Sequence, residues 1–312
     1  MLRILVSAFL IILALPALAD TPKRHDGANK DPGFFYKFVR SFSPEAAVDV
    51  WRGGKRPDLK TLLTLRGFML GDPVYIRLFK DEGVIEVWMQ KNAESRFELF
   101  EVYPICKHSG ALGPKVKQGD RQAPEGFYEV NRRHLNPNSK YHLAINMGYP
   151  NAFDKAHGRT GDFLMIHGAC ASIGCYALTN ANIEEVYAIV EAALNKGQEN
   201  IAVHAFPFRM TQDALIQRKD NKWIDFWMSD LLPVYDVFDI TGLPPRVMTC
   251  DKTYQLMNDL DPTNLPAGCE PIAAWGQTFV PSGEEPDFVP DAAPVTPPAP
   301  AYKPEASVSL VQ

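Results

Sequence analysis

A strand, a tight loop and a helix in the middle of the chain constrain its fold more than any other feature. Residues 162–166 (DFLMI) have the composition of a short core strand. Residues 182–194 carry apolar side chains at i, i+3, i+4 and i+7, the spacing of an amphipathic helix. The loop between them consists mostly of small residues, with one histidine, one serine and two cysteines. The pattern therefore predicts polar groups gathered at the end of a buried strand.

Two residues of this loop have the pattern of a nucleophilic site. His167 follows the strand directly, and Cys175 lies eight residues later. A cysteine nucleophile needs a base beside it and a backbone that can turn N–H groups toward a developing oxyanion. Gly168 and Gly174 allow that close approach because glycine has no Cβ. We therefore predict that Cys175 is the nucleophile and His167 its base.

The remaining groups of such a site are expected in the same loop. The Gly168 carbonyl is placed to accept from the second imidazole nitrogen and fix the tautomer, with Ser172 as the alternative third member. The N–H groups of Ile173, Gly174 and Cys175 are the predicted oxyanion donors.

The first nineteen residues indicate export. Arg3 is followed by an apolar run over residues 4–15 and by Ala17-Leu18-Ala19, the pattern of a signal peptide cleaved after Ala19. The run is shorter than the roughly 18–20 residues of a membrane-spanning helix, and we expect no other transmembrane segment. The predicted location is the periplasm. The net charge of −5 gives no basic footprint for nucleic acid.

Export makes the five cysteines informative, because most thiols pair in an oxidising compartment. Cys250 and Cys269 are close in sequence and form the most natural pair. Cys106 and Cys170 can form a second, leaving Cys175 as the free thiol. A Cys170–Cys175 redox pair is the alternative, although its spacing differs from a thioredoxin-like motif.

A zinc site is a further alternative, because His167, Cys170 and Cys175 are all possible ligands. A fourth ligand would come from one of three residues: Cys106, His108 or His204. No C-x2-C pairing is present, so we favour a site without metal. His204 lies in an apolar strand and is expected to be a hydrogen-bonded core residue.

The elements around the loop predict a mainly β fold with flanking helices. Alternating or apolar runs predict strands at 74–79, 84–89, 96–103, 126–130, 141–146 and 201–206, of which the first three form an antiparallel meander. Helices are expected at 43–51, 59–65, 182–194 and 211–232. Asn182 with Glu185 resembles a capping box for the third. Five apolar residues are expected to pack the last helix on the sheet: Leu215, Ile216, Trp223, Phe226 and Trp227.

These elements divide the chain into five parts. They are a signal peptide (1–19), an N-terminal extension with short helices (20–72), a catalytic domain (74–211), a helical and loop extension (212–279) and a Pro/Ala-rich disordered tail (280–312). The polar stretches 107–125 and 148–161 are predicted loops. The first is longer than a plain connector and is expected to be functional.

His167-Gly168 and Ser172-Ile173-Gly174-Cys175 resemble the active-site signature of the L,D-transpeptidase (YkuD) family, in which a histidine and a small residue precede a Ser-His-Gly-Cys block. Four further segments resemble the YafK-like branch of that family and occur in its order: residues 119–128, 135–139, 157–161 and 203–211. The resemblance covers about residues 74–211. It implies a catalytic domain of the family's β-sandwich or barrel type.

The sequence departs from the broad family at two places. Ile173 stands at the position of the histidine of Ser-His-Gly-Cys, and Tyr176-Ala177 replaces Ile-Arg, so an arginine that helps to hold the substrate is missing. The YafK-like branch shares these departures. The resemblance associates it with cutting the amide between meso-diaminopimelate of peptidoglycan and the C-terminal lysine of an attached lipoprotein.

Together these observations predict a cysteine enzyme of cell-wall biogenesis and cell shape that acts on peptidoglycan stem peptides through an acyl-thioester, without metal or organic cofactor. The predicted partner is a peptidoglycan-attached outer-membrane protein.

The candidate contacts to an anionic substrate are Lys115, Arg121 and Arg159, which lie on polar loops, together with Ile173. Two alternatives remain. One is transpeptidation, which forms 3–3 cross-links or attaches proteins, and the other is a non-catalytic wall-binding protein.

Overall fold

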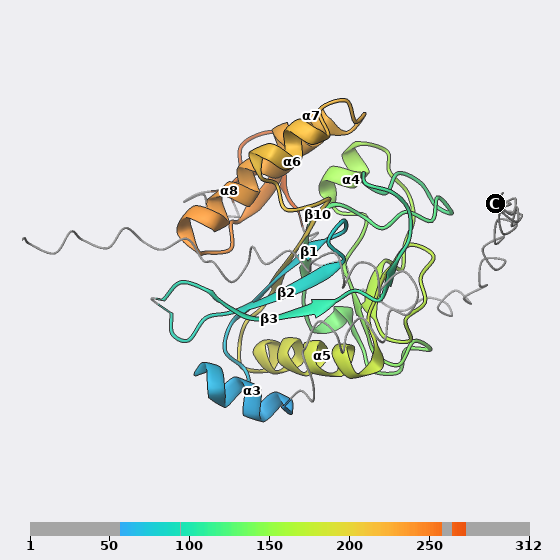
Figure 1. Ribbon diagram of the computed structural model, residues 1–312. Helices are drawn as coiled ribbons and strands as arrows, with labels where there is room; N and C mark the ends of the chain where they lie inside the picture. Colours follow the sequence, from blue (N-terminus) through green and yellow to red (C-terminus); the bar gives the residue numbers. More distant parts are fainter. Residues whose placement is uncertain (1–56, 94, 258–263, 273–312) are drawn as a thin grey trace, which may run out of the picture.

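The computed structural model describes residues 57–93, 95–257 and 264–272 (Figure 1). The predicted signal peptide, the helix expected at 43–51 and the Pro/Ala-rich tail lie outside these residues. Within the described ranges the fold is mainly β with flanking helices, as the sequence predicts. No helix of these ranges is both long and apolar enough to cross a bilayer.

A five-stranded sheet forms the centre of the molecule, with strand order β3-β2-β1-β10-β5. Its strands are β1 (Val74–Phe79), β2 (Val84–Met89), β3 (Glu98–Pro104), β5 (Gly126–Val130) and β10 (Ile201–Phe206). The antiparallel meander of β1, β2 and β3 is confirmed. β10 pairs in parallel with β1, although more than a hundred residues separate them.

Both faces of this sheet are buried, which explains why β1 and β2 contain almost continuous apolar runs. One face packs against α5 and the second sheet, through residues such as Ile76 and Val203. The other face packs against the C-terminal helices, through residues such as Phe79 and Phe206. α5 and the group α6–α8 accordingly lie on opposite sides of the sheet in Figure 1.

The second sheet has the order β4-β9-β8-β7-β6 and carries the loop of residues 168–175 between β8 and β9. Its strands are short: β4 (Lys107–His108), β6 (Leu135–Asn136), β7 (Ala144–Asn146), β8 (Met165–His167) and β9 (Tyr176–Ala177). β7 and β8 begin later than predicted. His142 and Phe163 have φ values of 76° and 52°, and this left-handed backbone cannot continue a strand.

The helix after this loop, α5, runs over Asn180–Asn195 and buries Ile183, Val186 and Val190. The predicted cap at Asn182 is wrong. Thr179 is the N-cap, and its side chain accepts from the Asn182 N–H. The helix therefore starts closer to Cys175 than the capping-box pattern suggests.

The remaining helices surround these two sheets. They are α3 (Leu59–Arg66), α4 (Ala152–Ala156), α6 (Gln212–Gln217), α7 (Ile224–Phe226) and α8 (Leu232–Thr241), with a 3-10 turn at Arg132–His134 and a π-helical turn at Trp227–Leu231. α3 confirms the helix expected at 59–65, whereas α4 lies in a stretch predicted as loop. Of the five packing residues predicted for 211–232, Leu215 and Trp227 are buried, Trp223 and Phe226 are partly buried, and Ile216 is exposed.

A small third sheet completes the described chain, with β11 (Val247–Cys250) between β12 (Thr253–Leu256) and β13 (Cys269–Pro271). It packs with the C-terminal helices on the central sheet through Val247, Tyr254 and Ile272. The segment after residue 211 therefore shares a hydrophobic cluster with the central sheet.

Candidate active site

A cavity of about 350 Å³ lies where β8 ends and the glycine-bounded loop begins. Its lining includes most of the predicted site: His167, Ser172, Ile173, Gly174, Cys175, Lys115 and Arg121. Sequence reasoning missed Tyr141, Asp162 and Phe163, which also line it. They lie in stretches predicted as strand, where no chemical motif distinguishes them.

His167 is the last residue of β8 and is almost completely buried. Its Nδ1 lies 2.7 Å from the Gly168 carbonyl oxygen, the contact expected from the sequence. A carbonyl oxygen only accepts hydrogen bonds, so Nδ1 must carry a proton. In the neutral ring the unprotonated nitrogen is then Nε2, which is the nitrogen that can act as a base.

Cys175 is the one free cysteine of the chain, since the other four form the bonds Cys106–Cys170 and Cys250–Cys269. This confirms the pairing favoured from the sequence. The Cys106–Cys170 bond also removes both of these thiols from the ligands of the alternative zinc site, and it excludes a Cys170–Cys175 bond in this state. The half-buried Cys175 Sγ lies 3.4 Å from the Phe163 carbonyl oxygen.

Ser172 supports the shape of the loop and makes no hydrogen bond with His167, so its prediction as an alternative third member is wrong. Its hydroxyl donates to the Cys175 carbonyl at 2.7 Å and accepts from the Gly174 N–H at 3.1 Å. Ser109 contacts both the hydroxyl and the carbonyl of Ser172. Because the Gly174 N–H is bonded to Ser172, Gly174 is not an oxyanion donor in this state. The N–H groups of Ile173 and Cys175 stay as predictions.

Residues 109–125, called the wall loop below, form one side of the cavity through Lys115, Gln118, Gly119 and Arg121. Asp120 fixes the conformation by accepting from the N–H groups of Val116, Lys117 and Gln122 and from Lys115 Nζ. Burial acts to raise the pKa of Asp120, but these donors outweigh it and hold the pKa below its usual value.

The three basic residues predicted to contact an anionic substrate have different environments. Arg121 lines the cavity. Lys115 also lines it, but its ammonium is 2.6 Å from Asp120 and is therefore neutralised within the loop. Arg159 is absent from the lining. It is buried, pairs with Asp154 at 2.8 Å and packs on Phe153, so its prediction as a substrate contact is wrong.

The wall loop is anchored by a buried ion pair that sequence reasoning did not identify. Lys80 follows β1 and lies with Nζ 3.1 Å from Glu125 Oε1, and both side chains are fully buried. Three carbonyls of the wall loop accept from the same ammonium: Ala111, Gly113 and Ala123. Glu125 in turn accepts from Trp227 Nε1 at 2.9 Å. The only sequence signal was a lysine directly after an apolar strand.

His204 has the structural role predicted for it. It is buried in β10, and its Nδ1 lies 2.8 Å from the Tyr75 hydroxyl. Burial, with a smaller contribution from the charge of Arg77, lowers its pKa to about 3. His204 is therefore neutral at physiological pH.

The amino-acid sequence of the chain is similar to sequences of known proteins. The profile of the L,D-transpeptidase catalytic domain (YkuD) matches residues 98–205. "Putative L,D-transpeptidase YafK" of Escherichia coli K12 is 45% identical over 192 residues, which are 62% of this chain and 77% of that protein.

Solved structures show a more distant likeness. The helical cell shape determining protein Pgp2 of Campylobacter jejuni has 19% identity and a TM-score of 0.35, over 61% of this chain and 79% of that one. Bd1075 of Bdellovibrio bacteriovorus has 15% identity and a TM-score of 0.33, over 65% of this chain and 91% of that one. Because 45% of the matched residues are identical to those of YafK and the match covers 77% of that protein, the chain belongs to the L,D-transpeptidase (YkuD) family.

Proposed function

We propose that this member of a peptidoglycan-acting family is a cysteine enzyme that hydrolyses the amide between diaminopimelate of the stem peptide and an attached protein. The observation that carries the proposal is the meeting of the one free thiol, Cys175, and the buried His167 in a single cavity. A tautomer with its lone pair on Nε2 gives His167 the form that a base requires. A wall-binding protein would need neither group.

The reaction begins when His167 Nε2 takes the proton of the Cys175 thiol and the sulfur attacks the carbonyl carbon of the amide. The resulting oxyanion is held by backbone N–H groups, for which the Ile173 amide beside the cavity is our candidate. Collapse of this intermediate breaks the C–N bond, and His167 returns the proton to the leaving amine. A thioester on Cys175 is left.

Water then completes the cycle by attacking the thioester with His167 as base, which releases a diaminopimelate carboxylate and the free thiol. An amine in place of water would give transpeptidation. We favour water because Ala177 is fully buried in β9 and supplies no cation to hold a donor carboxylate. A charge-assisted contact of this kind is typically worth about 1.5–3 kcal/mol, so its loss costs on the order of tenfold in donor handling.

A C-terminal lysine forms this amide through its side-chain amine, so its own carboxylate lies several bonds away from the scissile amide and the missing cation matters less for release of the attached protein. We further propose that the mature chain begins after Ala19 and works in the periplasm, where this substrate lies. Intact-mass analysis of the exported protein measures that cleavage directly.

The test uses purified sacculi that carry both cross-links and bound protein, followed by mass spectrometry of the released fragments. We expect the enzyme to release bound protein faster than it forms 3–3 cross-links. Cys175→Ala and His167→Ala should each abolish release while leaving folding intact, and the double variant should be little worse than either single one. New 3–3 cross-links with the protein still attached would instead identify a transpeptidase. Near-wild-type activity of Cys175→Ala would refute the mechanism.

A further inference from the structure

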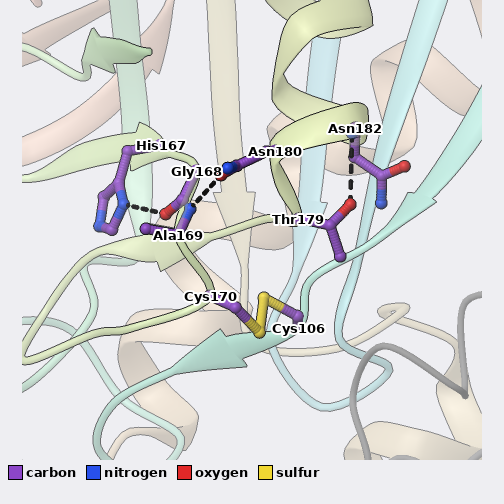
Figure 2. The surroundings of a disulfide bond; sticks show 8 residues. All are labelled: Cys106, His167, Gly168, Ala169, Cys170, Thr179, Asn180 and Asn182. Atoms are coloured by element: carbon purple, nitrogen blue, oxygen red, sulfur yellow. Dashed lines mark hydrogen bonds between the residues drawn. A yellow bond between two sulfur atoms is a disulfide. The ribbon is translucent and has the colours of Figure 1, made fainter. Parts of the chain in front are cut away.

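The peptide unit between Gly168 and Ala169 is held from both sides. Its oxygen, the Gly168 carbonyl, lies 2.7 Å from His167 Nδ1. Its N–H, that of Ala169, donates to Asn180 Oδ1 at 2.8 Å. Figure 2 shows His167 and Asn180 on opposite sides of this peptide, with a hydrogen bond to each. A side chain outside the loop therefore contacts the same peptide plane that fixes the tautomer of the proposed base.

The loop needs such a restraint because its backbone is strained directly after this peptide. Ala169 and Cys170 have φ values of 61° and 52°, and neither is glycine. Each residue in this left-handed region costs on the order of 1–3 kcal/mol and persists only when its surroundings hold it. Cys170 is held by its bond to Cys106 and by its N–H, which donates to the Leu178 carbonyl. The corresponding restraint on Ala169 is Asn180.

Gly168 and Asn180 also fit each other sterically. A Cβ built on Gly168 would lie 2.8 Å from Asn180 Oδ1 and 2.8 Å from the Tyr141 carbonyl oxygen. The absence of a side chain at Gly168 is thus what admits the amide oxygen. Asn180 itself is the first residue of α5, directly after the Thr179 cap, so the helix fixes where that oxygen lies.

We propose that Asn180 is a positioning residue for catalysis, acting on His167 through the Gly168–Ala169 peptide. By accepting from the Ala169 N–H, it sets the plane of the peptide and polarises the Gly168 carbonyl. The oxygen then stays aimed at Nδ1, the ring keeps its lone pair on Nε2, and the imidazolium formed in the reaction is stabilised. This inference rests on the proposed role of His167 as base, and it adds a residue that does not touch the substrate.

The experiment compares Asn180→Ala with Asn180→Asp, which keeps an acceptor oxygen at the same place. We expect Asn180→Ala to lower kcat for protein release by about three- to tenfold with little change in KM, the size expected for one hydrogen bond. The apparent pKa of the basic group in the kcat profile should fall, because a less polarised carbonyl stabilises the imidazolium less. Asn180→Asp should restore kcat and return this pKa to its original value or higher.

Thr211→Ala is the matched control, because the Thr211 side chain likewise accepts from a backbone N–H, that of Ala214, at the start of α6 and away from the cavity. It should lower stability to a similar extent and leave the pH profile unchanged. If Asn180→Ala behaves like this control, or if Asn180→Asp restores nothing, the positioning role is refuted.

A second readout does not depend on turnover. Nitrogen-15 NMR of the His167 ring in the Cys175→Ala background reports the tautomer and the pKa directly. We expect Asn180→Ala to lower the pKa and to populate the Nε2-protonated tautomer. If the ring responds in this way but the wild-type chain releases no protein, the inference stands and the proposed function fails. An unchanged ring refutes the inference, whatever the activity.

Discussion

The buried ion pair of Lys80 and Glu125 gives a sharp test of how the wall loop is held. The Lys80 ammonium lies 3.1 Å from the Glu125 carboxylate, and neither side chain is exposed to solvent. It also donates to three carbonyls of the wall loop, at 2.9, 2.8 and 2.9 Å: Ala111, Gly113 and Ala123. Burial acts to lower the pKa of Lys80, and the neighbouring Glu125 opposes this. Every donor of this ammonium thus contacts the loop that forms one side of the cavity.

Replacing Lys80 by methionine keeps the unbranched stem of the side chain up to Cε but removes its charge and its donors. The Glu125 carboxylate then stays buried without its counter-ion, although Gly113 N and Trp227 Nε1 still donate to it. Removing one partner of a buried ion pair typically costs about 3–5 kcal/mol, more than the pair itself contributes. The orphaned carbonyls add to this cost, so we expect the free energy of unfolding to fall by at least about 3 kcal/mol.

Urea unfolding followed by tryptophan fluorescence measures the change, and the sacculus assay measures activity below the unfolding transition. We expect activity to fall with stability, because Lys115 and Arg121 of the wall loop line the cavity. The double variant Lys80→Met/Glu125→Gln is the control, since it removes the buried charge as well. It should recover at least about 1 kcal/mol relative to Lys80→Met.

The reasoning is refuted if Lys80→Met costs less than about 1 kcal/mol, which would mean that the buried carboxylate finds another way to be satisfied. It is also refuted if the double variant is less stable than Lys80→Met. That outcome would show that the carboxylate stabilises the loop without the lysine.

Three further predictions concern other parts of the fold. The pKa of His204, lowered from 6.5 to about 3 by burial, means that only the unfolded chain takes up this proton between those pH values, so stability is lost as pH falls. We therefore expect the free energy of unfolding of the wild type to fall between pH 7.5 and pH 4.5, and we expect His204→Gln to remove roughly 2–3 kcal/mol of that fall. Urea unfolding at the two pH values measures the difference, and an equal fall in both proteins would contradict this. Replacing Cys106 and Cys170 by alanine opens a loop of sequence separation 64 and should cost about 4 kcal/mol in the same assay, whereas a cost below about 1 kcal/mol would argue against the bond. Gly168→Ala should destabilise by about 1–3 kcal/mol through overpacking and also lower turnover, whereas Gly158→Ala, which meets no atom within 4 Å, should leave turnover unchanged.

The sequence by itself determined the local elements and the chemistry of the loop. Apolar runs over 74–79 and 84–89 and the helical stripe over 182–194 predicted elements that the structure contains. The odd number of cysteines in a chain predicted to be exported indicated that one thiol stays free. These inferences succeeded because they depend on residues that are close in sequence or on composition alone. Backbone conformation interrupted the pattern only locally, as at His142 and Phe163.

Tertiary structure decided which charges face the cavity. Arg121 and Arg159 lie in similar polar stretches, yet only Arg121 lines the cavity, while Arg159 turns inward to Asp154 and Phe153. Lys115 reaches the cavity but is neutralised by Asp120. No local pattern separates these cases, because an ion pair is settled by which elements pack together.

The same holds for the contacts that support the site. Lys80 and Glu125 meet only because the chain folds the wall loop back over the end of β1. Asn180 reaches the Ala169 N–H only because Thr179 caps α5 and Asn180 begins it, so that the cap lies three residues before the predicted one at Asn182. Sequence spacing identifies residues with the right chemistry. Whether they can exchange a proton or share a hydrogen bond depends on distances of a few ångströms, which long-range packing alone sets.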